Sequence, residues 1–151
     1  MASSTADRVA RNTPEEINQR IRNATEMNVV WAAQEGPAGI DRRLRELDQE
    51  WDIERCLETG AASLTVLGVA MGTNGDRKWL LLPAVVGGFL LLHVVQGWCP
   101  PLPVLRRLGV RTAGEINEER TALKALRGDF SGITLGAGAD SIRQALAAAR
   151  R

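Results

Sequence analysis

The chain has 151 residues, enough for one domain, and its 19 Lys and Arg side chains nearly balance its 18 Asp and Glu side chains. This balance argues against a nucleic-acid partner, which would call for a basic surface. Two cysteines are too few for a secreted disulfide framework. The apolar residues are concentrated in the middle third of the chain, and both flanks are charged.

The N-terminal segment, residues 1–37, is predicted to be polar with one short helix that follows a disordered start. The sequence Thr13-Pro14-Glu15-Glu16 is typical of a helix start. The Thr13 hydroxyl can accept a hydrogen bond from a backbone N–H. Pro14 fits the first turn of a helix, and Glu16 stands at the capping-box position. Gly36-Pro37 predicts the end of this segment.

An amphipathic helix is predicted over residues 38–57. Its apolar side chains recur at helical spacing and form one stripe, consisting of Ile40, Leu44, Leu47 and Trp51. Such a stripe could lie on a membrane surface, pair with a second helix or cover a local core. An ordinary amphipathic surface helix has the same pattern. The mixed charges on the other faces favour a protein partner, because a helix bound to anionic lipid has a mostly basic polar face.

The stretch from Trp79 to Cys99 contains no Asp, Glu, Lys or Arg. It is about 20 residues long, which is the length that a helix needs to cross a bilayer. Trp79 and Trp98 stand at its ends, where indole rings favour the membrane–water interface. We predict a transmembrane helix here. The alternative is a buried core helix of a soluble protein.

Residues 58–74 form a second, weaker membrane candidate, and the turn-forming Asn74-Gly75 joins it to the first. We therefore predict a transmembrane hairpin over residues 58–105, with spans at about 58–74 and 79–98. Small residues on one face of the first arm would allow close helix packing, and a small face on the second arm matches them. These residues are Ala61, Thr65, Gly68 and Gly72, with Ala84 and Gly88 opposite. Either the two arms pack together, or two hairpins pack as a homo-oligomer.

Basic residues near the predicted spans indicate the orientation. Arginines precede the first span and follow the second, which favours cytoplasmic termini, although Arg77 and Lys78 lie in the turn. The expected location is the bacterial inner membrane, crossed by more than one span. The prolines after Cys99 end the second span. Arg106 and Arg107 follow them and are expected to contact lipid phosphate groups.

The C-terminal third is predicted to hold a charged cytoplasmic helix over residues 106–128, followed by a flexible linker and a short helix over residues 129–151. Thr112 and Glu115 form a second capping box. The apolar face of the charged helix consists of Ile116, Leu123 and Leu126. The glycine-rich linker lacks the spacing and the context of a nucleotide-binding loop.

Few side chains in the predicted hairpin could carry chemistry. His93 and Gln96 lie inside the second span on roughly the same face, and an interhelical hydrogen bond explains them better than a proton or ligand site. Cys56 and Cys99 should lie at similar depth, so they are candidate reactive thiols. They are equally consistent with two small apolar residues. A lone histidine predicts no metal site.

The sequence Gly97-Trp98-Cys99-Pro100-Pro101, followed by Leu105-Arg106-Arg107-Leu108-Gly109, resembles the YgaP-like transmembrane family of small bacterial inner-membrane proteins. The resemblance covers about residues 52–110. It implies a two-helix membrane domain that often self-associates, and in some relatives this domain is fused to a rhodanese sulfurtransferase domain. No strand-rich domain or persulfide-binding loop surrounds either cysteine in this chain, so the resemblance does not extend to sulfur transfer.

We therefore expect an all-α protein with a two-helix transmembrane hairpin and amphipathic cytoplasmic helices on both sides. Its expected role is interaction or scaffolding in the membrane, with self-association or an unidentified protein partner. No catalytic site and no cofactor are predicted. The alternatives are a membrane-anchored sulfur or redox carrier that uses Cys99, and a soluble helical protein that buries the hairpin.

Overall fold

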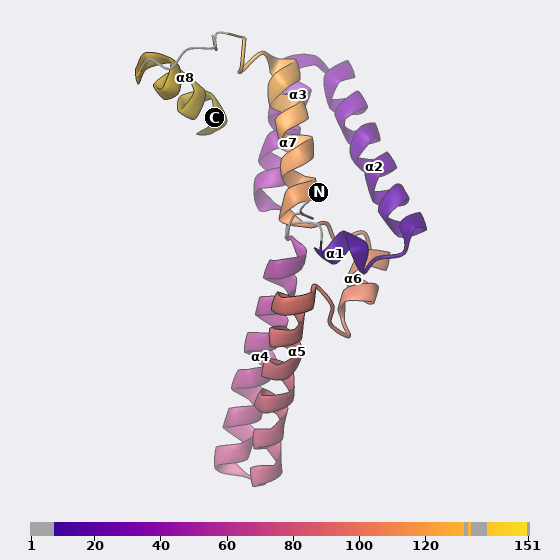
Figure 1. Ribbon diagram of the computed structural model, residues 1–151, viewed down its shortest axis with the longest axis vertical. Coiled ribbons are helices and arrows are strands. Elements are labelled where there is room, and N and C mark those ends of the chain that lie inside the picture. Colours follow the sequence, from indigo (N-terminus) through magenta and orange to yellow (C-terminus); the bar gives the residue numbers. More distant parts are fainter. Residues whose placement is uncertain (1–7, 132, 134–138, 151) are drawn as a thin grey trace. The chain divides into compact units, whose positions relative to one another are not determined.

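The computed structural model describes residues 8–131, 133 and 139–150, and within these ranges it contains helices and no strands. The all-α prediction is therefore confirmed, and two of the helices are apolar and long enough to cross a membrane. In chain order the elements are α1 (Arg8–Arg11), α2 (Glu15–Gln34), α3 (Gly36–Gln49), α4 (Ile53–Asn74), the 3₁₀ helix η2 (Arg77–Leu80), α5 (Leu81–Gln96), α6 (Leu102–Arg107), α7 (Ala113–Arg127) and α8 (Ala139–Arg150) (Figure 1).

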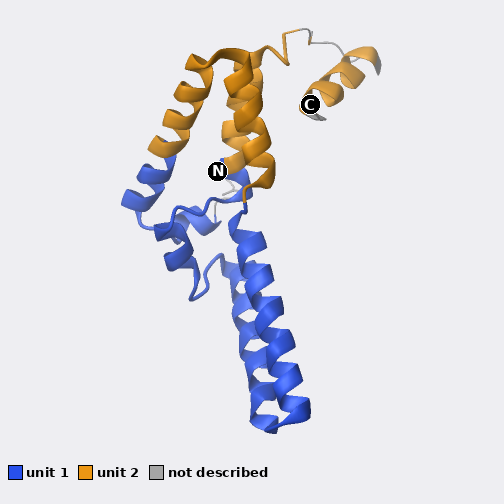
Figure 2. Ribbon diagram, turned by 180° about the vertical axis from the view of Figure 1, so that it is seen from behind, with its two compact units in different colours: residues 1–22, 51–115 blue, residues 23–50, 116–151 orange. Residues whose placement is uncertain are grey.

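The chain divides into two compact units, which Figure 2 shows in blue and orange. Unit 1 comprises residues 1–22 and 51–115, and unit 2 comprises residues 23–50 and 116–151. The division falls within α2 and again within α7, near its start. Each unit has its own hydrophobic core.

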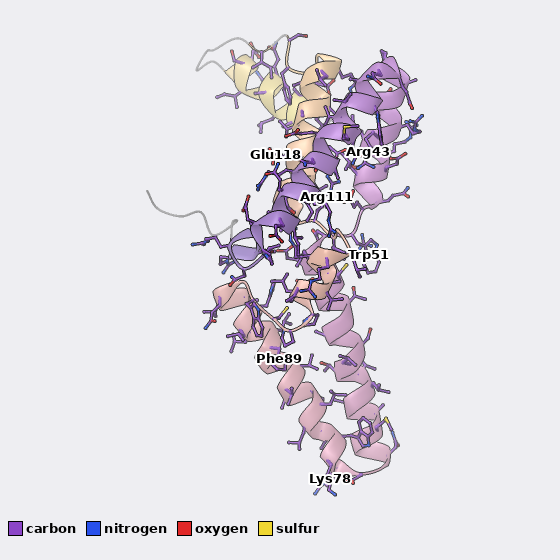
Figure 3. The ribbon with its side chains drawn as sticks, turned by 90° about the vertical axis from the view of Figure 1, so that its right-hand side faces the viewer. Arg43, Trp51, Lys78, Phe89, Arg111 and Glu118 are labelled. Atoms are coloured by element: carbon purple, nitrogen blue, oxygen red, sulfur yellow. The ribbon has the colours of Figure 1, made fainter. Side chains whose placement is uncertain are left out.

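Unit 1 contains the antiparallel pair α4 and α5, which lie side by side and are joined through η2 (Figure 1). Lys78 lies at this turn and Phe89 about halfway along α5 (Figure 3). At the end of the pair opposite this turn, residues from α1, α4, α6 and the segment after α5 form a small core. It consists of Val9, Ile53, Leu57, Cys99 and Leu102.

Helix α4 begins at Ile53, earlier than the predicted start at residue 58. Asp52 caps it, because its carboxylate accepts a hydrogen bond from the Arg55 backbone N–H at 2.7 Å. The Ile53 N–H donates to the Arg111 carbonyl at 2.9 Å. The charged residues here resembled the end of the preceding helix, but they form the first turn of α4. Cys56 consequently lies inside α4 rather than before it.

Unit 2 is built on α3 and the main part of α7. The stripe predicted on α3 is buried at Ile40, Leu44 and Leu47, and it packs in one cluster with Ile116 and Leu123. The cluster also includes Ala32 of α2, so the stripe packs against other helices of the same chain. Beside the cluster, Arg43 Nε donates to Glu119 at 2.7 Å. Burial favours the neutral form of Arg43, but its carboxylate partners outweigh this effect and raise its pKa.

Several local predictions differ from the structure. Trp51 leaves the α3 stripe and stands 45% exposed, with the Arg55 guanidinium 4.4 Å from its ring centre. Helix α2 runs to Gln34 and is longer than the short helix predicted, because no helix-breaking residue precedes Gly36, which has a φ of +73°. Leu126 is exposed.

The start of the chain is also more ordered than expected, since α1 lies within the segment predicted to be disordered. Residues 1–7 of that segment fall outside the described ranges. The same is true of residues 132 and 134–138 in the predicted flexible linker.

Candidate functional site

Helix α4 packs closely against the second arm at two glycines. A Cβ atom on Gly68 would lie 2.6 Å from Pro83 Cδ, and one on Gly72 would lie 2.6 Å from Leu80 Cδ2. Both glycines are buried, so their missing side chains are what allows this contact. A Cβ at Gly68 would therefore require the Pro83 ring to move, and one at Gly72 would require the Leu80 side chain to move.

The small residues predicted opposite these glycines are not part of the contact. Ala84 and Gly88 are exposed, and no atom lies within 4 Å of the position that a Gly88 Cβ would take. Gly88 therefore takes no part in the contact between the arms, in which Leu80 of η2 and Pro83 of α5 meet the two glycines. Ala61 and Thr65 on α4 are half-buried.

Further from the turn, the two helices diverge and leave a groove with a volume of about 410 Å³. Its walls are almost entirely apolar. The α4 side includes Cys56, Gly60 and Leu64, the α5 side includes Val86, Phe89 and His93, and the end is closed by Cys99, Pro100 and Leu105. This volume lies in the range of sites that bind small molecules.

His93 is the main polar side chain in the groove. It is 8% exposed, and its Nδ1 atom is buried without a hydrogen-bond partner. Gln96 follows three residues later in α5, and its side chain is exposed. An unpaired buried imidazole nitrogen is costly, by about 1–3 kcal/mol, so it marks the place where a partner atom is missing.

Both thiols line the same groove, and neither forms a disulfide. Cys56 is half-buried, whereas Cys99 is 3% exposed and belongs to the core of unit 1. Burial raises the pKa of the Cys99 thiol, and a hydrogen bond from the backbone of Leu102 only partly opposes this. A thiol of this kind is mostly protonated at neutral pH and is a weak nucleophile.

The C-terminal end of α5 is held by α1 and by the residue that follows it. Arg8 donates to the Val94 carbonyl, and Asn12 Nδ2 donates to the Gln96 carbonyl at 3.0 Å. The last carbonyls of a helix have no partner within the helix, so these side chains satisfy groups that would otherwise stay unpaired. Gly97 has a φ of +76°, and a Cβ there would lie 2.5 Å from Arg8 Cβ. A helix of four residues leaves no periodic pattern, so sequence reasoning missed it.

The side chain of Arg106 occupies the centre of a buried polar network, with 0% exposure. Each of its five N–H groups has an acceptor. These are Thr13 Oγ1 at 3.2 Å, the Val110 carbonyl at 3.2 Å, Asn18 Oδ1 at 2.9 Å, and the two oxygens of Glu115 at 2.7 and 2.8 Å. The predicted contact of Arg106 with lipid headgroups is therefore wrong, because no donor is left for a phosphate. Arg107 is exposed.

Two capping predictions meet in this network. Glu115 accepts from the Thr112 N–H at 2.8 Å and donates its own N–H to Thr112 Oγ1 at 3.2 Å, which is the predicted capping box of α7. Thr13 instead donates its hydroxyl to the Val9 carbonyl at 2.8 Å and accepts from Arg106. Its hydroxyl therefore serves the network rather than the predicted cap of α2.

Comparisons with models of protein families, with curated proteins and with solved structures find no match for this chain. The resemblance to the YgaP-like family therefore remains an expectation. Across the part of the chain that the structure describes, no group of three or more His, Cys, Asp or Glu side chains could hold a metal ion. The groove between α4 and α5 is the candidate functional site.

Proposed function

We propose that α4 and α5 anchor this protein in a membrane as a hairpin, and that the remaining helices make an interaction or scaffold module. One observation carries the proposal. In the most apolar stretches of the two candidate spans, only 17% and 6% of the residues are buried inside the protein. A core helix of a soluble protein would be mostly buried, so the alternative of a soluble protein that buries the hairpin is disfavoured.

The uncovered side chains are large and lie along both helices. Val66 is 69% exposed, and Leu81, Leu91 and Val95 are each exposed by 64% or more. In water these side chains would form a continuous apolar surface of the kind that soluble monomers avoid. In a bilayer the same side chains would face lipid, while the glycine contact between the arms supplies the packing.

The indole rings support a spanning orientation. Trp79 stands at the turn and Trp98 follows the end of α5, and both are partly exposed, by 42% and 38%. These are the positions of aromatic residues at the two interfaces of a bilayer. An even number of spans returns the chain to its starting side, so the segments before α4 and after α5 share one compartment. The basic residues of these segments favour the cytoplasm, which gives a multi-pass protein of the bacterial inner membrane.

The interaction role rests on a second exposed surface, in unit 2. Met27, Val30 and Trp31 lie on one face of α2, and each is exposed by 45% or more. A tryptophan among exposed apolar neighbours is typical of a protein-binding surface. Self-association is the other part of the proposal, and the exposed small residues Ala84 and Gly88 leave room for the close approach of a second hairpin.

The thiol-carrier alternative receives less support. Both thiols line one groove, which favours it, but the burial of Cys99 keeps this residue poorly nucleophilic. We therefore propose no catalytic activity and no cofactor for the chain.

The test is fractionation of the full chain expressed in a bacterium. Membranes are washed with alkaline carbonate, which strips peripheral proteins and leaves integral ones in the pellet. We expect the protein in the pellet, together with an integral marker protein. Release into the supernatant, with the marker retained, would overturn the membrane proposal.

A further inference from the structure

The two ends of the groove between α4 and α5 differ in polarity. From His93 to Leu82 it follows α5 for eleven residues, which corresponds to about 16 Å of helix. Its only nitrogen-bearing side chain, His93, lies within one turn of the end of α5, and the walls toward the turn are hydrocarbon. The groove therefore has a polar end where the chain leaves the hairpin and an apolar end deeper along it.

The size of the groove decides what can fill it. A helix about 10 Å across and 16 Å long occupies roughly 1,200 Å³, well above the 410 Å³ of the groove. Only side chains of a second hairpin, and not one of its helices, could enter a space of this size. Water is a poor occupant, because the apolar walls offer it few hydrogen-bond partners. A single hydrocarbon chain is the occupant that fits the groove along its length.

We propose that this groove binds one acyl chain of a bilayer phospholipid, with the ester carbonyl of that chain accepting a hydrogen bond from His93. The proposal rests on the proposed membrane function. In a phospholipid the ester carbonyl lies at the edge of the hydrocarbon layer and the chain points inward. This order matches the groove, whose polar end lies at the exit of α5.

The unpaired Nδ1 atom of His93 supports a polar contact at one end of the groove. A neutral imidazole carries one N–H donor, and the described residues offer no acceptor to Nδ1. A carbonyl that reaches Nδ1 from the groove would accept the hydrogen bond that this nitrogen lacks.

Two glycines allow a matched test. Gly60 and Gly87 both have open space where a Cβ would be, with no atom within 4 Å, but only Gly60 lines the groove. The substitution Gly60→Leu therefore places its Cβ in open space and adds its side chain to the groove. Gly87→Leu adds the same side chain to another face of the hairpin. Leucine is also the better helix former, so neither change should unfold a helix.

The experiment reconstitutes the full chain in phosphatidylcholine vesicles that contain a photoactivatable phosphatidylcholine, with a diazirine on one acyl chain. After illumination, mass spectrometry maps the labelled peptides. We expect labelling to concentrate on groove residues such as Leu64 and Val86, to fall several-fold in Gly60→Leu, and to persist in Gly87→Leu. Labelling that is spread evenly over the exposed faces, or that is unchanged in Gly60→Leu, would overturn the proposal.

A second arm tests the carbonyl contact. An ether-linked analogue of the probe lacks the ester carbonyl, so it should label the unaltered groove less than the ester probe does. In His93→Phe the two probes should label equally, which a purely structural role of His93 would not produce. Equal labelling by both probes in the unaltered protein would overturn the role of His93. Complete displacement of the probe by an equimolar short-chain quinone would overturn the choice of an acyl chain.

Carbonate extraction of each vesicle sample separates this proposal from the one on which it rests. Protein that is released from the vesicles contradicts the membrane function itself. Protein that remains integral, with no groove-specific labelling, contradicts only the lipid site.

Discussion

Arg106 and Glu115 form a paired ion bridge in unit 1, with two hydrogen bonds at 2.7 and 2.8 Å. The guanidinium is fully buried and the carboxylate is 21% exposed. The same arginine also bonds Thr13 and Asn18, which lie about ninety residues earlier in the chain. The pair therefore joins the start of α2 to α6 and to the start of α7.

Replacing Arg106 with methionine should destabilise unit 1 by about 3 kcal/mol, because it leaves a partly buried carboxylate and two polar side chains without their donor. Chemical unfolding in detergent, followed by tryptophan fluorescence, measures the loss. Arg107→Met is the matched control, since Arg107 is adjacent and exposed. Its effect should stay within about 0.5 kcal/mol. Equal effects of the two variants would contradict the role of the network.

The same pair predicts an acid-sensitive stability. Burial alone would raise the pKa of Glu115, but the bonds from Arg106 and Thr112 outweigh it and leave the pKa below its ordinary value of 4.5. A carboxylate whose pKa is lower in the folded state than in the unfolded state contributes its full stabilisation at pH values above the unfolded-state pKa. This stabilisation is lost as the pH falls through the folded-state pKa. Unfolding followed from pH 7 down to pH 3 should show the loss, and Glu115→Gln should reduce it. An unchanged pH profile in that variant would contradict the prediction.

The Arg106 network also shows where sequence reasoning stops. The capping box of α7 and the stripe on α3 depend on residues three or four apart, so local patterns reveal them. Two of the five acceptors around Arg106, on Thr13 and Asn18, come from a distant part of the chain. In addition, two adjacent arginines after an apolar stretch look alike in sequence. Only packing distinguishes the buried Arg106 from the exposed Arg107.

The groove is a similar case. The length and composition of the apolar stretches predicted two helices that could span a membrane, and the turn residues between them predicted that they would be neighbours. The groove itself depends on how the two helices pack, which no local pattern in the sequence shows. The sequence offered several small residues, and the structure uses Gly68 and Gly72 near the turn while leaving Gly60 open.

The contact between the two arms should respond to added volume. Gly68→Val places a methyl-bearing Cβ against Pro83, and overpacking of this kind costs about 1–3 kcal/mol. Gly87→Val is the control, because it brings the same intrinsic cost of valine in a helix but meets open space. Thermal unfolding in detergent should show a lower midpoint for Gly68→Val. A larger effect at Gly87 would contradict the observed packing.

The two thiols should differ in reactivity. Single-cysteine proteins, made with Cys56→Ser or Cys99→Ser, allow each thiol to be alkylated alone with a maleimide. We expect the half-buried Cys56 to react faster than Cys99 in the folded protein, and both to react alike in denaturant. Because the pKa of Cys99 is raised, its reaction should accelerate further as the pH is increased. Faster reaction of Cys99 at neutral pH would favour the thiol carrier over the scaffold.

Unit 2 offers the last prediction, at Arg43 and Glu119. The Glu119 side chain is fully buried and receives bonds from Arg43 at 2.7 and 3.3 Å. Arg43→Met should destabilise the packing of α3 on α7, because a buried carboxylate that loses a cationic partner is costly, by about 3 kcal/mol or more. Arg45→Met, two residues away on an exposed face, should change little. Hydrogen exchange of α3 and α7 measures both variants, and faster exchange of these helices only in Arg43→Met is the expected result. Unchanged exchange in that variant would mean that the apolar contacts of Leu44 and Leu47 hold the two helices together without the ion pair.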